Sequence, residues 1–232
     1  MRPQPVGEPL EWSPARRPAR TPLRGTHVLL RPIDSAADTE PLYAVSHPPV
    51  GDAAIWTYLF YGPFESIEEL RSLLVSVEHS EDPLYFAIVR TPEGRPEGMA
   101  SYMRIEPEQG VVEIGNIWFG TPLQRTASAT EAIYLLARHA FDELGYRRLE
   151  WKCDSLNAPS RRAAERFGFV FEGVFEQHII YKGRNRDTAW YAITDKRWPS
   201  VRAGFEAWLA PSNFDSEGCQ RRSLRALIRP EA

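Results

Sequence analysis

An apolar strand, a loop of small residues, a long amphipathic helix and a second strand follow one another in the middle of this chain, and this order most constrains the fold. Residues 111–119 predict the first strand, and Gly115 inside it is typical of a bulge or a close backbone approach. Residues 148–154 alternate between apolar and charged side chains and predict the second strand. The helix between them has apolar residues with helical spacing, namely Ile133, Leu136, Ala137, Ala140, Phe141 and Leu144. A right-handed crossover would make the two strands parallel neighbours and place the intervening loop at their carboxyl edge.

The loop before this helix is a candidate phosphate site. Residues 123–132 lead directly into the helix, and Arg125 adds a positive charge. The unpaired N–H groups and the positive end of the dipole at a helix N-terminus attract anions. Small residues before a helix are common, however, so the loop alone leaves phosphate binding open.

The rest of the chain mixes strands and helices, which indicates an α/β (α+β) fold. The expected helices are residues 38–46, 65–77 and 161–167, and the expected strands are residues 27–33, 84–90, 98–105, 169–172, 174–182 and 188–194. The turn from Gly183 to Asp187 predicts a hairpin tip whose charges are solvated. The aromatic stretch from Ala54 to Pro63 fits either a pocket wall or core packing.

The composition of the two ends suggests three regions. Residues 1–24 are rich in proline and arginine and predict an extended arm, which Trp12 and Leu23 could attach to the body. Residues 25–210 form the expected domain, and residues 211–232 form a basic tail, most simply a solvated helix face.

Charge and cysteine content exclude several classes of function. The chain has 28 Lys and Arg against 31 Asp and Glu, a net charge of -3, which disfavours a dedicated nucleic-acid binder. Its two cysteines match no disulfide framework or metal-ligand spacing, so no metal is expected. No apolar run is long enough for a signal peptide or a membrane span, and we expect a cytoplasmic protein without membrane contact.

Six short motifs in the second half of the chain carry a resemblance to a known family. They are Glu113-Ile114-Gly115, residues 124–132, Asn157-x-x-Ser160, residues 168–173, Gly183-Arg184-x-x-Asp187 and Trp198-Pro199. Together they resemble the GNAT-superfamily N-acetyltransferases of the RimJ/RimL ribosomal-protein type, over about residues 24 to 200. The resemblance implies one GNAT-like domain whose central twisted sheet is mixed and mostly antiparallel, with about six to seven strands, a splayed parallel central pair and flanking helices.

The same resemblance implies an acetyl-CoA site. Residues 124–129 match the family pattern Q/R-x-x-G-x-G/A, whose backbone holds the pyrophosphate, but Ala127 replaces the first glycine. The added Cβ matters little if φ is negative there and weakens coenzyme binding if φ is positive. A backbone N–H on the strand near Ile117 would polarise the thioester carbonyl. The implied cofactor-binding residues are Ile117, Trp118, Phe119, Gln124, Arg125, Thr126, Ala127, Ser128, Ala129, Thr130, Asn157 and Ser160.

Three residues are candidates for catalysis, each with a structural alternative. Ser160 would protonate the departing thiolate, or cap a helix, and Asn157 beside it would also serve as an N-cap. Glu113 would act as a general base through water, or form an ion pair. His178 is a second base candidate, although a lone histidine on a strand is more often structural. Trp56, Tyr58 and Tyr61 are the candidate substrate-binding residues.

The expected function is therefore direct transfer of an acetyl group from acetyl-CoA to a primary amine, on a protein N-terminus or a small molecule. An α-amine with a pKa near 8 is partly neutral at pH 7 and needs less help from a base than a lysine does. A non-catalytic acyl-CoA-binding or sensing module is the alternative. Edge strands and the arginine-rich tail also allow a homodimer.

Overall fold

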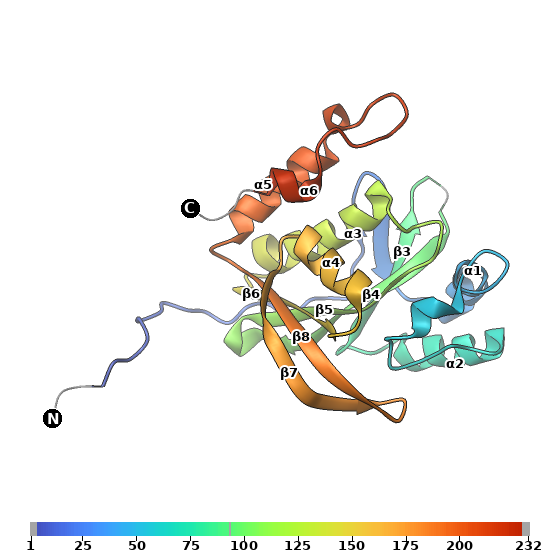
Figure 1. Cartoon of the computed structure of the whole chain (residues 1–232), viewed down its shortest axis with the longest axis horizontal. Coiled ribbons are helices and arrows are strands. Elements are labelled where there is room, and N and C mark those ends of the chain that lie inside the picture. The colour runs from blue at the N-terminus through green and yellow to red at the C-terminus, as the bar shows by residue number, and fades with distance from the viewer. Residues whose placement is uncertain (1–3, 93, 229–232) are drawn as a thin grey trace.

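One eight-stranded sheet runs through the molecule (Figure 1). The computed structural model describes residues 4–92 and 94–228, so the first residues of the expected arm and the last residues of the expected tail lie outside the described part. The strand order is β1-β2-β3-β4-β5-β6-β8-β7. The strands are β1 (Leu23–Arg24), β2 (Val28–Pro32), β3 (Leu84–Arg90), β4 (Pro96–Glu106), β5 (Val111–Phe119), β6 (Arg148–Asp154), β7 (Val170–Tyr181) and β8 (Arg184–Thr194).

The sheet is antiparallel except for its central pair, β5 and β6. These two parallel strands are in register only where residues 111–113 face residues 148–150, and they diverge beyond Glu113. This confirms the expected mixed sheet with a splayed parallel pair. The sheet has eight strands instead of six or seven because the two-residue strand β1 pairs with β2 at its edge. The strands expected at 169–172 and 174–182 form one strand, β7, with a register shift between Phe171 and Gly173.

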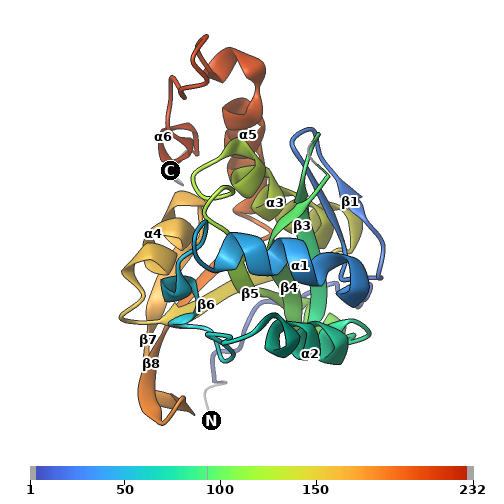
Figure 2. The ribbon, with the colours of Figure 1, turned by 90° about the vertical axis from the view of Figure 1, so that its right-hand side faces the viewer.

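Helices cover both faces of the sheet (Figures 1 and 2). The helices α1 and α2 lie on one side, whereas α3, α4 and α5 lie on the other. Successive residues of β3 join different apolar clusters, with Phe86 facing the α3 side and Tyr85 the α2 side, so the whole strand is apolar. The helices are α1 (Ser35–Ser46), α2 (Ile67–Val77), α3 (Ala127–Arg138), α4 (Ala158–Arg166), α5 (Trp198–Leu209) and α6 (Leu224–Leu227), with short turns η1 (Ala53–Trp56), η2 (Pro107–Gln109), η3 (His139–Glu143) and η4 (Pro211–Asn213).

Side-chain caps explain where four of these helices begin. Asp34, Ser66, Thr126 and Asn157 each precede a helix and accept a hydrogen bond from a backbone N–H of its first turn. The long central helix continues past α3 as the π-helical turn η3 and stops before Gly145, which has a φ of 81°. The caps therefore place the N-termini of α3 and α4 at the carboxyl edge of the central strands.

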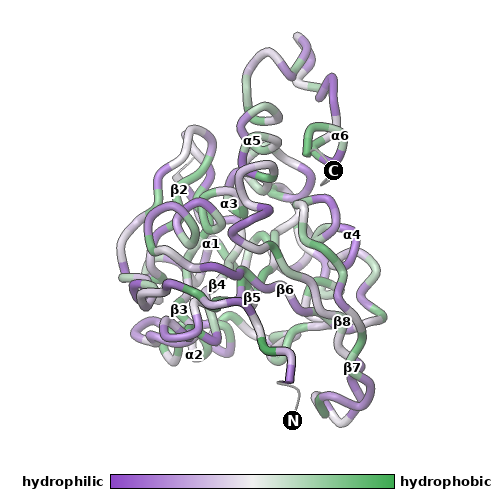
Figure 3. Tube along the Cα trace, turned by 90° about the vertical axis from the view of Figure 1, so that its left-hand side faces the viewer, coloured by the Kyte–Doolittle hydropathy of each residue, from purple (hydrophilic) through white to green (hydrophobic). Residues whose placement is uncertain are grey.

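From Trp12 at one end and up to Ile228 at the other, the terminal segments pack against the domain, whereas residues 4–11 are exposed. The Trp12 ring contacts the main core, its Nε1 donates to the carbonyl of Glu108, and Leu23 is buried, as the sequence predicts. At the other end, Leu224 is fully buried and Ile228 is 7% exposed. Figure 3 shows hydrophobic residues in α6, next to α5. The segment after residue 210 is thus not simply a solvated tail, because its apolar side chains complete the core around α5.

Among residues 4–92 and 94–228, no helix combines the length and apolar character needed to cross a bilayer.

Candidate active site

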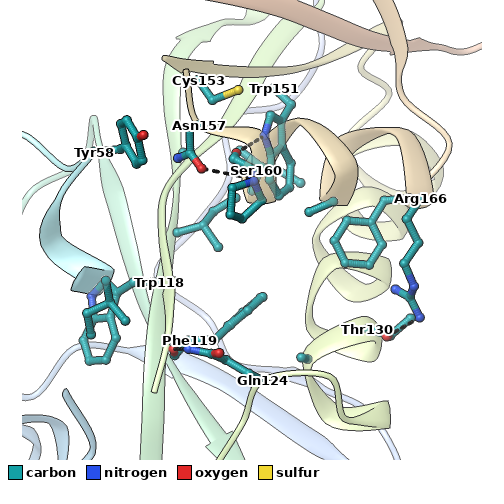
Figure 4. A pocket seen from close by; sticks show the side chains of 18 of the residues that line it. Tyr58, Trp118, Phe119, Gln124, Thr130, Trp151, Cys153, Asn157, Ser160 and Arg166 are labelled. Atoms are coloured by element: carbon teal, nitrogen blue, oxygen red, sulfur yellow. Dashed lines mark hydrogen bonds between the residues drawn. The ribbon is translucent and has the colours of Figure 1, made fainter. Parts of the chain in front are cut away.

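A cavity of about 1600 Å³ opens where β5 and β6 diverge. Its walls come from the ends of β5 and β6, the N-termini of α3 and α4, the η1 region, and the β7–β8 hairpin. Figure 4 shows Asn157, Ser160 and Tyr58 on one side of this opening and Gln124 on the other. The topology therefore brings most of the predicted site residues into one cavity.

A bulge in β5 exposes backbone to the cavity. Asn116 has a φ of 52°, and the register between β4 and β5 shifts there, so neither Asn116 nor Ile117 has a cross-strand partner. Asparagine tolerates this left-handed conformation, and its Nδ2 donates to Ser101 Oγ at 3.0 Å. The unpaired backbone polar groups of this bulge are therefore available to a ligand.

The N-terminus of α3 suits a phosphate. Thr126 caps the helix by accepting from the Ala129 N–H, while the N–H groups of Ala127 and Ser128 have no acceptor within the described chain. Ala127 is the first residue of α3 and is absent from the residues with positive φ, so the missing glycine costs no backbone strain. The positive φ of this loop, 61°, falls on the exposed Arg125. The donors and charge expected for a pyrophosphate are in place.

Two predicted residues of this loop use their side chains for contacts within the protein. The Ser128 hydroxyl donates to the carbonyl of His27, and Ser128 does not line the cavity. Gln124 Nε2 donates to the carbonyl of Phe119 at 2.9 Å, which ties the loop to the end of β5 (Figure 4). The other predicted residues of the loop, Arg125, Thr126, Ala127, Ala129 and Thr130, line the cavity together with Ile117, Trp118 and Phe119.

The first turn of α4 holds the second group of predicted residues. Asn157 Oδ1 caps the helix by accepting from the Ser160 N–H at 3.1 Å, so the expected capping role is confirmed. The Ser160 Oγ accepts from Trp151 Nε1 at 3.0 Å, so its own hydrogen can be donated to a second group (Figure 4). Burial raises the pKa of the neighbouring Cys153 thiol, although a hydrogen bond with Ser160 partly offsets the shift. Cys153 is therefore a protonated thiol and a poor nucleophile at neutral pH.

Glu113 is buried and paired with two cations. Lys152 Nζ lies 3.0 Å and Arg104 Nε lies 3.1 Å from its Oε2. Burial raises the pKa of Glu113 above the ordinary value, and the two cations partly oppose the shift. Lys152 is itself only 4% exposed, contacts Glu150, and lies 4.0 Å from the centre of the Trp190 ring. The ion-pair alternative for Glu113 is thus realised, and the carboxylate still lines the cavity.

His178 lies on the far side of the cavity, on β7. Its ring packs against Phe175 and Trp190, and its buried Nδ1 has no hydrogen-bond partner within the described residues. Burial and nearby cations lower the pKa of His178 below its ordinary value, so the ring is neutral at pH 7. The structure places His178 in the cavity wall with Glu113 and Ser160.

The aromatic stretch divides between core and cavity. Trp56 is fully buried and packs against Trp118 and Phe64, and neither Trp56 nor Tyr61 lines the cavity. Tyr58 does line it, and its hydroxyl donates to the carbonyl of Leu156 at 3.2 Å. Of the three candidate substrate-binding residues, only Tyr58 is therefore placed to contact a substrate directly.

Several cavity residues were not predicted from the sequence. Arg166 donates to Thr130 Oγ1 at 3.2 Å and adds a cation beside the start of α3. Trp208 and Phe214, from the C-terminal segment, form part of the same wall. Arg186 was expected at a solvated hairpin tip, but it is 6% exposed because β8 begins at Arg184, earlier than predicted. Neither Arg166 nor Arg186 could be recognised as a cavity residue from the sequence, because basic residues are common at the ends of short helices and in charged turns.

The chain belongs to the GNAT acetyltransferases. Residues 27–170 match the family model described as an acetyltransferase (GNAT) domain. The fold also matches a GCN5-related N-acetyltransferase from Brucella melitensis, which is 43% identical, with a TM-score of 0.90 over 94% of this chain and 98% of that one. A Chromobacterium violaceum structure described within the GNAT family is 36% identical, with a TM-score of 0.77 over 86% of this chain and all of the other. An uncharacterised N-acetyltransferase, p20 from Bacillus licheniformis, is 24% identical over 63% of this chain and 84% of p20.

A structure with lower sequence identity has the same fold and was solved with acetyl-CoA bound. The microcin C7 self-immunity acetyltransferase MccE, solved in complex with acetyl-CoA and AMP, is 22% identical, with a TM-score of 0.64 over 73% of this chain and 93% of that one. As a member of the GNAT acetyltransferases, the protein uses acetyl-CoA, and the free N–H groups at the start of α3 fit its pyrophosphate. Within the described ranges, no group of three or more His, Cys, Asp or Glu side chains is arranged to hold a metal ion.

Proposed function

We propose that this acetyltransferase transfers the acetyl group directly to a primary amine, of a protein N-terminus or a small molecule, within a ternary complex. One observation carries the proposal. The divergence of β5 and β6 beyond Glu113 joins the free N–H groups of α3, the unpaired backbone at Asn116 and Ile117, and the Ser160 hydroxyl in a single cavity. Such an arrangement holds both substrates together and stabilises developing charge.

Each group has a proposed task. The backbone N–H groups near Ile117 polarise the thioester carbonyl, and Ser160, whose Oγ accepts from Trp151, donates its hydrogen to the departing thiolate. Asn157 keeps its Nδ2 available for the coenzyme arm, because only its Oδ1 is used by the cap. Cys153 is protonated and hydrogen-bonded, which argues against an acetylated enzyme intermediate.

We propose that Glu113 positions the cavity wall and that no strong base is required. Its carboxylate is held by Lys152 and Arg104. An amine with a pKa near 8 already has a neutral fraction at pH 7, so desolvation and orientation supply most of what the attack needs. His178, neutral and with a free Nδ1, is the better placed acceptor for the proton released by the amine.

The finer assignment to the RimJ/RimL type is part of the same proposal. It is supported by the motif series from Glu113 to Pro199 and by a Vibrio cholerae structure, described provisionally as a ribosomal-protein-serine acetyltransferase, that is 20% identical, with a TM-score of 0.63 over 75% of this chain and 97% of that one.

We propose the cytoplasm as the location of the protein and a homodimer as its assembly. The edge strand β7 would provide the interface, since Phe171, Val174, Phe175 and Ile180 are exposed on it.

The test is release of the coenzyme A thiol from acetyl-CoA with a panel of peptides and small amines. The enzyme proposal requires thiol release that depends on an amine and an acetylated product of matching mass. Binding of acetyl-CoA without release on any amine would favour the acyl-CoA-binding module instead. Binding is checked separately by thermal unfolding, because acetyl-CoA at 100 times its Kd adds about 2.7 kcal/mol, or roughly 5 to 11 °C.

A further inference from the structure

Arg186 lies in the acceptor part of the cavity, on the strand β8 of the β7–β8 hairpin (Figure 1). It pairs with Ile179 of β7 and is only 6% exposed. Its guanidinium carbon lies 5.3 Å from the centre of the Phe60 ring and 5.9 Å from that of Tyr181. Two aromatic rings therefore hold the guanidinium in place at the cavity wall.

This buried cation has no counter-ion among the residues that the structure describes. Its Nε has no hydrogen-bond partner, and Arg186 forms no ion pair within residues 4–92 and 94–228. The acidic groups around it are already engaged. Asp154 accepts from the Tyr181 hydroxyl and the Leu156 N–H, and Asp187 accepts from the Gln177 N–H and Asn185. A buried charge without a partner is costly, so an anion from outside would stabilise it.

The other cations of this wall differ from Arg186. Arg104 and Lys152 both pair with Glu113, and Lys152 pairs with Glu150 as well. Each of these cations therefore already has its carboxylate. Among these three cations, which lie on β4, β6 and β8, Arg186 has no carboxylate partner in the described part of the chain.

Two further buried polar atoms near Arg186 have no hydrogen-bond partner among the described residues. Thr188 lies two residues along the same strand, so its side chain is on the same face, and its buried Oγ1 has no hydrogen-bond partner in the described ranges. The same holds for the Nδ1 of His178, and all three residues line the cavity. Thr188 is paired with Asp154, at the end of β6 where the two central strands have separated. The three groups are therefore next to the proposed transfer position.

We propose that Arg186, with Thr188 beside it, binds an anionic oxygen group, a carboxylate or a phosphate, carried by the amine acceptor. A guanidinium offers a planar set of donors that matches these oxygens, and the threonine hydroxyl can add one more hydrogen bond. The inference rests on the proposed function, because it names the acceptor of that reaction. An acceptor without the anion would leave the guanidinium buried and unpaired, so the enzyme prefers acidic amines over neutral ones of the same shape.

The experiment compares matched pairs of acceptors that differ only in the charged group. One arm uses β-alanine and its amide, a second uses phosphoethanolamine and ethanolamine, and a third uses peptides with Glu or Gln after the N-terminal residue. We expect kcat/KM to favour the anionic member of at least one pair by about tenfold or more, the value of one charge-assisted hydrogen bond. The pair that shows the preference identifies the source of the anion. Equal kcat/KM within all pairs would overturn the proposal.

The variant Arg186→Gln tests whether this residue is responsible. It should lose most of the preference, and Arg186→Lys, which keeps the charge without the planar fork, should retain an intermediate preference. Arg184→Gln is the matched control, because Arg184 is exposed on the same strand and should keep the full preference. A preference that survives in Arg186→Gln would contradict the assignment.

A binding measurement separates this proposal from the proposed function. In the presence of coenzyme A, the anionic member of at least one of the three pairs should raise the Tm of the wild-type protein more than its neutral partner, and should do so much less in Arg186→Gln. This readout does not require turnover. If acetyl transfer fails but the selective stabilisation is observed, the anion site stands and the transfer reaction does not. If neither anion nor neutral partner stabilises the protein, the anion site is refuted.

Discussion

At the scale of single residues, the Ser160 hydroxyl is the group whose role is most sharply defined. It accepts from Trp151 Nε1, so its hydrogen can be donated to a leaving thiolate. The variant Ser160→Ala should lower kcat by about 100-fold, the lower range for a lost general acid. Its acetyl-CoA-induced rise in Tm should be unchanged, because the helix cap uses the backbone N–H of residue 160.

The control for this variant is Ser76→Ala, which removes an exposed hydroxyl on α2. It should have wild-type kcat. A Ser160→Ala enzyme with wild-type kcat would mean that water or the solvent protonates the thiolate, and the assignment of Ser160 would be dropped.

Glu113 illustrates how an ion pair and a base can be told apart. The variant Glu113→Gln leaves Lys152 and Arg104 without their shared carboxylate, and should lower the free energy of unfolding in urea by about 3 kcal/mol. Because Lys152 and Arg104 hold the carboxylate in place, we expect the shape of the pH profile of kcat/KM to stay the same. It should fall toward low pH as the acceptor amine and then His178 are protonated, and this fall should be the same in the wild type and the variant.

The competing role makes the opposite prediction for the pH profile. The pKa of Glu113 is raised above 4.5 by burial, so a base at this position would add its own loss of activity as pH falls through that raised pKa. If this acidic limb is present in the wild type and disappears in Glu113→Gln, Glu113 is the base and the positioning role is wrong.

At the scale of elements, the start of α3 is the proposed site of the coenzyme phosphates. Ala127 stands where the family pattern has glycine, but it adopts a helical φ as the first residue of α3. The variant Ala127→Gly should therefore change the Kd for acetyl-CoA by less than about threefold, which is under 1 kcal/mol. Isothermal titration calorimetry measures this directly, and binding at least tenfold tighter would show that the alanine does obstruct the phosphate.

Several elements could be predicted from the sequence, and the reasons are physical. The strands 111–119 and 148–154 have the predicted bounds, because alternating or continuous apolar residues depend on burial alone. The splay of β5 and β6 was expected only from the family resemblance. The splayed part of β5 contains the bulge at Asn116, whose left-handed conformation no periodicity reveals.

The hairpin β7–β8 shows where prediction from the sequence fails. The charged run from Gly183 to Asp187 has the composition of a solvated turn, yet Arg186 is buried because Phe60 and Tyr181 cover it. Phe60 is distant in the sequence from β8, so the contact is purely tertiary. Similarly, Trp56 and Tyr61 were expected near a substrate but pack away from the cavity, since the same aromatic composition suits a core.

At the scale of the whole molecule, the C-terminal segment belongs to the fold. Leu224 is fully buried beside α5 and α4, although the basic composition of residues 211–232 suggests a tail. The variant Leu224→Ala should therefore lower the free energy of unfolding by about 3 kcal/mol, through lost burial and a cavity. The exposed neighbour Arg225→Ala is the control and should change it by less than about 0.5 kcal/mol. Equal stability of the two variants in urea titration would show that the segment is dispensable.

The whole molecule also explains why one cavity serves two substrates. The start of α3 and Arg166 gather cations and free N–H groups at one end, while Glu113, His178 and Arg186 line the other. The Ser160 hydroxyl and the unpaired backbone near Ile117 lie in the same cavity. This geometry supports the proposed direct transfer, because both reactants can be present together and the buried Cys153 is unsuited to carry the acetyl group.

The measurement that tests direct transfer most simply is the initial rate of thiol release with both substrates varied. If acetyl-CoA and the amine must be bound together, the double-reciprocal lines intersect, and the apparent KM for one substrate depends on the other. This is the result that we predict. Parallel lines, together with an acetylated protein formed in the absence of amine, would show that the acetyl group is first transferred to the enzyme and would contradict the account.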